Sequence, residues 1–269
     1  MLPASAQPAT DTLHPYRSFW MAGFEGADHR NAHGIPLDLV RANGHLEHLD
    51  DDYRRLAALG LRTVRESVGW RVSEPHGIAC GASPSRFDFS RALRFAEVAD
   101  RHGLQLLWTL MHYGRPDDVD LFADDFADRL ADFAAAAARA LRGTAGEVAV
   151  YTPVNEISFL AWAISETQII HPYKREIDAR NRDGGAHRDV GWEAKWRLVR
   201  GALRAIEAIR AEDPSARFLH VEPLIHIAPP RHAPELAWRA DEIAEYQWQA
   251  WDMLAGRLLP ELGGSIDSL

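Results

Sequence analysis

The chain has 269 residues, of which 46% are hydrophobic, and its formal net charge at pH 7 is −9. This length and composition are enough to bury the core of one large domain, so we expect a single domain over residues 1–269 with an N-terminal extension over residues 1–17. An acidic chain without a run of Lys or Arg is a poor partner for nucleic acid or for an anionic membrane surface, which excludes both from the expected partners.

The cysteine content and the first residues bear on the compartment. Cys80 is the only cysteine, which excludes an internal disulfide and a cluster of thiolate ligands. The N-terminal residues have neither a basic start nor an apolar run of secretory length, and no later stretch is long enough for a membrane-spanning helix. We therefore expect a cytoplasmic protein.

Short β-rich runs alternate with longer amphipathic segments along the chain. In chain order, the expected strands cover residues 19–24, 61–66, 104–110, 148–154 and 218–222, and the expected helices cover residues 45–59, 91–102, 124–141, 192–211 and about 234–259. The clearest helix is 124–141, in which Phe126, Leu130, Phe133 and Leu141 recur at helical spacing. Residues 157–191 are polar and are expected to form a long loop.

This alternation indicates the fold class. Strands that alternate with helical segments are typical of a parallel sheet with helical connections, as in a TIM-type (β/α) barrel. A complete barrel has eight strands, whereas five are visible here. The expected fold is therefore an α/β protein, a TIM-type barrel that is incomplete, with about five of eight strands.

Polar residues stand where several of these strands end. Glu25 follows the first strand, Arg65 ends the second, His112 follows the third, and Asn155 and Glu156 follow the fourth. In a parallel barrel the active site lies at the carboxyl ends of the strands. We therefore expect these side chains to share one site.

Three sequence motifs strengthen this interpretation. Residues 152–156 read TPVNE, residues 64–75 read VRESVGWRVSEP, and residues 109–116 read TLMHYGRP. Their order and spacing resemble those of the clan A retaining glycoside hydrolases, and in particular of the family 1 β-glucosidases. The resemblance covers about residues 19–222 and ends after about the fifth βα unit.

Glycoside cleavage explains why these residue types are needed. One carboxylic acid must protonate the leaving oxygen, and a second carboxyl group acts from the other side of the sugar ring. Glu156 is the candidate acid/base. By the resemblance, Asn155 would donate a hydrogen bond to the sugar 2-hydroxyl.

The resemblance also implies roles for residues on the other strands. Arg65 would hold the nucleophilic carboxylate and keep it ionised. His112 and Glu25 would bind ring hydroxyls. Trp70 would pack near the sugar or support Arg65.

The second carboxylate is harder to place. Glu222 is the remaining conspicuous carboxylate and is a candidate substrate-binding residue after the fifth strand. The family's nucleophile lies on the seventh strand, and no Thr-Glu-Asn segment follows Glu222. The nucleophile is therefore not visible at an obvious position.

Other classes of site lack support in the sequence. His29 and His33 are four residues apart, but neither they nor the pair His220 and His226 fit a helical HExxH pattern. No glycine-rich phosphate loop opens a helix after a strand. We therefore expect neither a catalytic metal nor a cofactor.

The leading hypothesis is a β-glucosidase-like hydrolase that cleaves β-linked glycosides with retention, with Glu156 as acid/base. The alternative is an inactive, non-catalytic barrel remnant that binds carbohydrate, and another clan A hydrolase is a third possibility. The expected partner is a carbohydrate substrate. An open barrel would also leave exposed sheet edges through which copies could associate.

Overall fold

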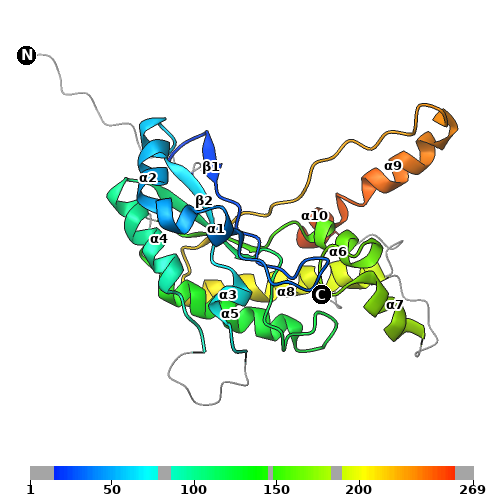
Figure 1. Ribbon diagram of the computed structural model, residues 1–269, viewed down its shortest axis with the longest axis horizontal. Coiled ribbons are helices and arrows are strands. Elements are labelled where there is room, and N and C mark those ends of the chain that lie inside the picture. Colours follow the sequence, from blue (N-terminus) through cyan, green and yellow to red (C-terminus); the bar gives the residue numbers. More distant parts are fainter. Residues whose placement is uncertain (1–14, 78–85, 145–147, 183–189, 258–269) are drawn as a thin grey trace, which may run out of the picture.

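The computed structural model of the protein describes residues 15–77, 86–144, 148–182 and 190–257, and these contain one five-stranded parallel sheet (Figure 1). Its strands are β1 (Met21–Gly23), β2 (Thr63–Ser67), β3 (Gln105–Met111), β4 (Val150–Val154) and β5 (Arg217–Phe218). Each strand pairs with the next in chain order, so β1 and β5 are the edges. The predicted parallel α/β sheet of about five strands is confirmed.

Four long helices connect the strands and pack neighbour against neighbour around one side of the sheet (Figure 1). They are α2 (His45–Ala58), α4 (Ser90–Arg101), α5 (Phe126–Leu141) and α8 (Val190–Glu212), and α1 (Leu39–Ala42) and α3 (Trp70–Ser73) are single turns in the loops. The apolar stripe predicted on α5 is buried, including Phe126, Leu130 and Phe133. All seven residues of β3 are buried, as expected of a central parallel strand.

The segment predicted as a long loop is largely helical. It contains α6 (Ile157–Glu166) and α7 (Lys174–Arg182). The loop prediction was wrong because the few apolar residues at its start, including Ile157, Leu160 and Ile164, are enough to bury one face of α6, which packs against α8.

The C-terminal helix is interrupted. The structure has a 3₁₀ turn η1 (Pro234–Leu236), then α9 (Ala237–Glu245) and α10 (Gln249–Leu254), where one helix was predicted. Between α9 and α10, the Gln247 side chain accepts a hydrogen bond from Ile225 N (3.0 Å) and donates one to Ile225 O (3.3 Å). The Gln247 side chain thus pairs with both backbone polar groups of Ile225. The predicted helix is interrupted at this residue, whose side chain is buried.

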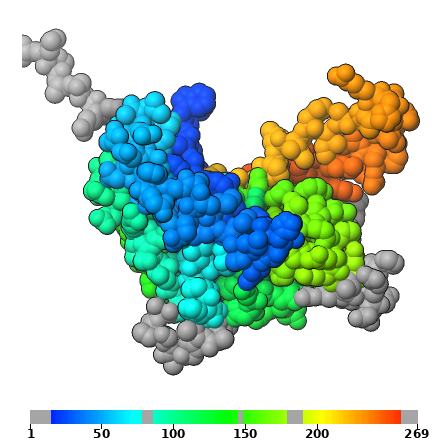
Figure 2. All heavy atoms as spheres, in the orientation of Figure 1, coloured from blue at the N-terminus to red at the C-terminus, as the bar shows by residue number. Residues whose placement is uncertain are grey.

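The molecule is hollowed between β1 and the arm that carries α9 (Figure 2). Large apolar side chains are exposed on both sides of the hollow, among them Phe19 (87%) and Trp20 (75%) beside β1 and Trp238 (64%) in α9. The strand predicted over residues 19–24 is shorter in the structure, because β1 pairs with β2 only over Met21–Gly23. Self-association through the sheet edges stays a prediction.

The predicted N-terminal extension falls mostly on residues outside those described. Within the described part, Arg17 N donates to Thr63 Oγ1 (3.1 Å) and Gln105 Oε1 (3.0 Å), and Gln105 Nε2 donates to Pro15 O (2.7 Å). Residues 15–17 are thus attached to the amino ends of β2 and β3. No helix in the described ranges is long and apolar enough to cross a membrane.

Candidate active site

The polar residues predicted to form the site meet where β2, β3 and β4 end. Arg65 lies in β2, beside Leu107 of β3. Asn155 follows β4, and its backbone N–H donates to Met111 O at the end of β3 (3.0 Å). Parallel register therefore brings the ends of three strands to one edge of the sheet, as the barrel interpretation requires.

A continuous chain of hydrogen bonds joins five side chains at this edge. Arg65 Nε donates to Thr109 Oγ1 (2.8 Å), and its Nη2 donates to Asn155 Oδ1. Asn155 Nδ2 donates to the Tyr113 hydroxyl (3.0 Å), and that hydroxyl donates to Glu156 Oε2. The candidate acid is thus connected to the half-buried guanidinium of Arg65 through two neutral side chains.

The backbone of Glu156 is itself unusual. Its φ is 47°, and no other residue except glycine has a positive φ in the described ranges. This left-handed conformation is uncommon for a residue with a Cβ and persists only where the surroundings hold it. Glu156 N donates to Val221 O (2.9 Å), and the residue is the N-cap that precedes α6, where the helix dipole favours a carboxylate.

Burial is the main cause of the pKa shifts of Arg65, Tyr113 and His112. It lowers the pKa of Arg65, against the nearby charge of Glu156, but a guanidinium remains protonated in any case. It raises the pKa of Tyr113, an effect to which the bond with Glu156 adds, so the phenol keeps its proton. Burial also lowers the pKa of His112 to about 4, which leaves its imidazole neutral at pH 7.

Glu25 and His112 lie together beside the cluster. Glu25 Oε1 is 3.8 Å from His112 Nε2 and accepts a hydrogen bond from Ala27 N (2.8 Å). The Glu25 side chain is 55% exposed, so its carboxylate is open to a ligand.

Glu222 does not join this set. Its side chain is only 1% exposed, and its Oε1 is 3.0 Å from His220 Nε2. Its carboxylate accepts a hydrogen bond from Ser158 N (3.0 Å), in the first turn of α6. Because its side chain is only 1% exposed and its carboxylate is bound to Ser158 N, Glu222 is corrected from a substrate contact to a residue that holds the start of α6.

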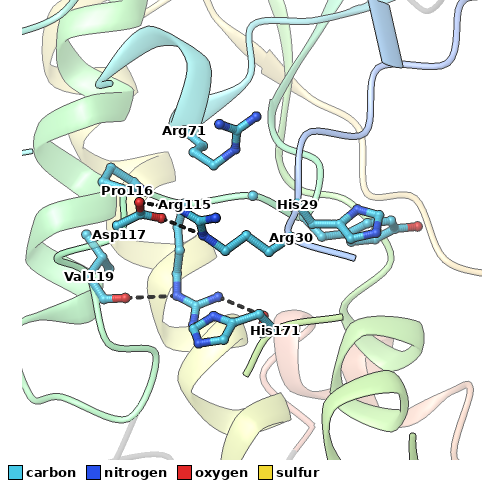
Figure 3. Close-up of a pocket in the computed structure, with 10 residues that line it drawn as sticks. His29, Arg30, Arg71, Arg115, Pro116, Asp117, Val119 and His171 are labelled. Atoms are coloured by element: carbon cyan, nitrogen blue, oxygen red, sulfur yellow. Dashed lines mark hydrogen bonds and ion pairs between the residues drawn. The ribbon is translucent and has the colours of Figure 1, made fainter. Parts of the chain in front are cut away.

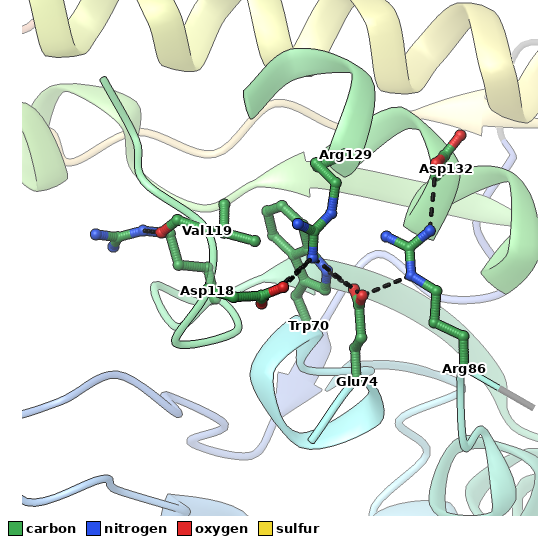
Figure 4. A network of polar contacts seen from close by, with 8 residues as sticks. Trp70, Glu74, Arg86, Asp118, Val119, Arg129 and Asp132 are labelled. Carbon is green, nitrogen blue, oxygen red and sulfur yellow. Dashed lines mark hydrogen bonds and ion pairs between the residues drawn. The ribbon is translucent and has the colours of Figure 1, made fainter. Parts of the chain in front are cut away.

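Trp70 is part of the core. It is 0% exposed and stacks on Phe133, at 5.8 Å between ring centroids. Its Nε1 donates to Glu74 Oε2 (2.7 Å), and Figure 4 shows Glu74 held in turn by Arg86 and Arg129. No face of the indole is open to a sugar, so the predicted substrate contact is corrected to a packing role.

A small pocket adjoins the cluster and shares Tyr113 with it (Figure 3). Besides Tyr113, the side chains around it are basic for the most part, and they include His29, Arg30, Arg71, Arg115 and His171. Several of them hold the walls together: Arg30 pairs with Asp117, and Arg115 Nε donates to Val119 O (3.0 Å). Burial lowers the pKa of His29 and of His171.

Tyr113 is the site residue that the sequence did not single out. An aromatic residue after His112 belongs to the motif, but the motif does not require a hydroxyl there. The signal was the tyrosine itself, because a phenol at a strand end can donate to a neighbouring carboxylate. In the described part of the chain, no three His, Cys, Asp or Glu side chains come together as a metal site.

Solved structures with a similar fold include family 1 β-glucosidases. The AHE enzyme from Alicyclobacillus herbarius superposes with a TM-score of 0.62 at 18% identity, over 81% of this chain and 46% of that one. The virulence factor SghA from Agrobacterium tumefaciens gives 0.59 at 17%, over 81% and 46%. The family 1 β-glucosidase from Thermotoga maritima gives 0.58 at 16%, over 76% and 43%.

These matches define the class of fold. The chain forms an incomplete TIM-type β/α barrel similar to that of the family 1 β-glucosidases, as the motifs predicted. It spans less than half the length of each of these three structures. No protein-family model matches the sequence, and no curated protein gives a significant match.

Proposed function

We propose that the chain carries the acid/base half of a β-glycosidase site and acts on β-linked glycosides by a retaining mechanism. The observation that carries this function is the hydrogen-bonded chain from Arg65 through Asn155 and Tyr113 to Glu156. It fixes a carboxyl group at the carboxyl end of a barrel strand, where barrel enzymes hold their catalytic residues.

The chemistry needs Glu156 twice. Protonated Glu156 gives its proton to the glycosidic oxygen as the bond to the anomeric carbon breaks, while a second carboxylate attacks that carbon from the other side. Glu156, now ionised, takes a proton from the water that releases the sugar. In this proposal His112 and Glu25, which lie 3.8 Å apart, bind ring hydroxyls, and the pocket next to Tyr113 receives the leaving group.

Arg65 is the residue expected to hold the second carboxylate. Of the carboxylates in the described ranges, none lies within 4 Å of its guanidinium. This observation favours the second candidate function, a non-catalytic protein that binds carbohydrate at the same edge of the sheet. The two functions differ in turnover and share the binding step.

Hydrolysis of 4-nitrophenyl β-glucoside by the purified protein separates them. The enzyme hypothesis predicts release of nitrophenol that is lost in Glu156→Gln and kept in Glu166→Gln, a control on the exposed last residue of α6. The assay is repeated with sodium azide, since azide can replace a missing nucleophile by attacking the anomeric carbon and would yield the α-glycosyl azide.

Each result has a defined meaning. Turnover with or without azide, abolished by Glu156→Gln, supports the glycosidase function. Methyl β-glucoside binding seen by saturation-transfer NMR, with no turnover under either condition, refutes the enzyme hypothesis and supports the binding protein. Absence of both turnover and binding refutes both functions.

A further inference from the structure

Tyr113 touches both the candidate acid and the residue beside it. Its hydroxyl donates to Glu156 Oε2 and accepts from Asn155 Nδ2 (3.0 Å). The residue is only 7% exposed, and its ring packs against His29, His112 and Phe159. Packing on several sides therefore fixes the ring, and with it the position of the hydroxyl.

Arg65 determines which atom donates and which accepts in each hydrogen bond of the chain from Arg65 to Glu156. Arg65 has donors and no acceptor, so the atom of Asn155 that faces it must be the amide oxygen. The amide nitrogen then faces Tyr113 and occupies an acceptor position of the phenol oxygen. The phenol has one proton, and the remaining partner for that proton is Glu156.

We propose that Tyr113 is a positioning residue for Glu156, which holds one carboxyl oxygen so that the other faces the glycosidic oxygen, and which stabilises the carboxylate as its proton leaves. Because Glu156 is the acid only if the proposed function holds, this role of Tyr113 rests on that function. Oε2 receives the Tyr113 hydrogen bond, and Oε1 carries the proton that moves to the leaving oxygen.

A hydrogen bond of this kind strengthens as Glu156 loses its proton, because a bond to an ionised acceptor is stronger than one to a neutral acceptor. Its contribution is therefore largest for leaving groups that depend on protonation. For a leaving group that departs readily as an anion, proton transfer adds little to the rate, and loss of the bond should have a small effect.

The kinetic test compares Tyr113→Phe with the wild-type protein on two substrates. We expect kcat/KM for phenyl β-glucoside to fall about tenfold to a hundredfold, and that for 2,4-dinitrophenyl β-glucoside to fall much less. A variant that only disturbs packing would lower both by the same factor. Equal losses on the two substrates, or no loss on either, would overturn the role of Tyr113.

Tyr53→Phe is the matched control. Tyr53 is 0% exposed and its hydroxyl also donates to a buried carboxylate, Glu66 Oε1 (2.7 Å), between α2 and β2. Its loss removes the same kind of hydrogen bond at a place away from Glu156. We expect Tyr53→Phe to lower the unfolding temperature while the ratio of the two kcat/KM values stays at its wild-type value.

A second test needs no turnover and no change at Tyr113. The ¹³Cζ chemical shift of tyrosine at pH 7 reports the strength of the hydrogen bond that the phenol donates, and Tyr113→Phe assigns the signal. Glu156→Gln replaces the carboxyl acceptor by an amide group and should move the Tyr113 signal, whereas Glu166→Gln should not. An unmoved signal overturns the contact even where the protein shows hydrolysis, and absence of hydrolysis with a moved signal refutes the glycosidase function alone.

Discussion

Substitution of Asp28 by Asn should change how the stability of the protein depends on pH. Asp28 is 1% exposed, its Oδ1 accepts a hydrogen bond from Gly114 N (3.0 Å), and its Oδ2 has no partner in the described part of the chain. Burial raises the pKa of Asp28 to about 6, although the charge of Arg71 acts in the opposite direction. This carboxyl group links the loop after β1 to the residue next to Tyr113.

The magnitude follows from the difference between the folded and unfolded pKa. The unfolded value is 3.8 and the folded value about 6, so the folded state binds a proton more readily than the unfolded chain between these two pH values. Stability is therefore lost as the pH rises from about 4 to about 6. At about 1.4 kcal/mol for each pKa unit, the ionised carboxylate costs about 3 kcal/mol above this range.

Urea unfolding followed by circular dichroism at several pH values between 4 and 8 measures this effect. The free energy of unfolding of Asp28→Asn minus that of the wild type should rise by about 2.4 kcal/mol from pH 4 to pH 7, whatever its value at pH 4. In the control Asp38→Asn, burial alone would raise the pKa of Asp38, but the hydrogen bonds and charges of Arg91 and Arg41 together outweigh burial and lower it. The free energy of unfolding of Asp38→Asn minus that of the wild type should therefore fall as the pH rises. A difference for Asp28→Asn that does not change with pH would refute the reasoning.

Three further substitutions test the structural roles assigned to Trp70 and Glu222 and the close approach of Gly114 to the backbone of Asp28. Trp70→Phe removes the donor to Glu74 and should lower the free energy of unfolding by about 1–3 kcal/mol, with KM for aryl glycosides unchanged. Glu222→Gln removes a charge at the start of α6 and should cost about 0.5–1 kcal/mol in urea unfolding. Gly114→Ala places a Cβ 2.4 Å from the backbone oxygen of Asp28 and should cost about 2 kcal/mol or more by the same measurement.

The strands and the site at their ends could be predicted because both depend on local sequence. A parallel strand between two layers is a short apolar run, and the residues that follow it reach the same edge of the sheet without knowledge of any contact. Arg65, Asn155 and Glu156 were placed together for this reason, and the structure joins them by hydrogen bonds through Tyr113.

The errors concern residues whose environment is decided by distant parts of the chain. Trp70 follows a strand by three positions, and the sequence does not say that α5 will cover it with Phe133. Glu222 lies two residues after His220, but its burial depends on the start of α6. Tyr113 was not among the predicted site residues, because its contact is with the carboxylate of Glu156, which lies 43 residues later in the chain.

The charge balance at the sheet edge explains why the unidentified carboxylate matters. Arg65 is a half-buried cation that cannot lose its proton, and within the described residues it reaches Glu156 only through Asn155 and Tyr113. A partly buried charge without a direct ionic partner is costly. A carboxylate or another anion bound beside Arg65 would therefore be stabilised by the Coulomb attraction of the guanidinium. The guanidinium thus favours an anionic second group at the place where the proposed chemistry needs one, and formate or azide should bind there more weakly in Arg65→Gln than in the wild-type protein.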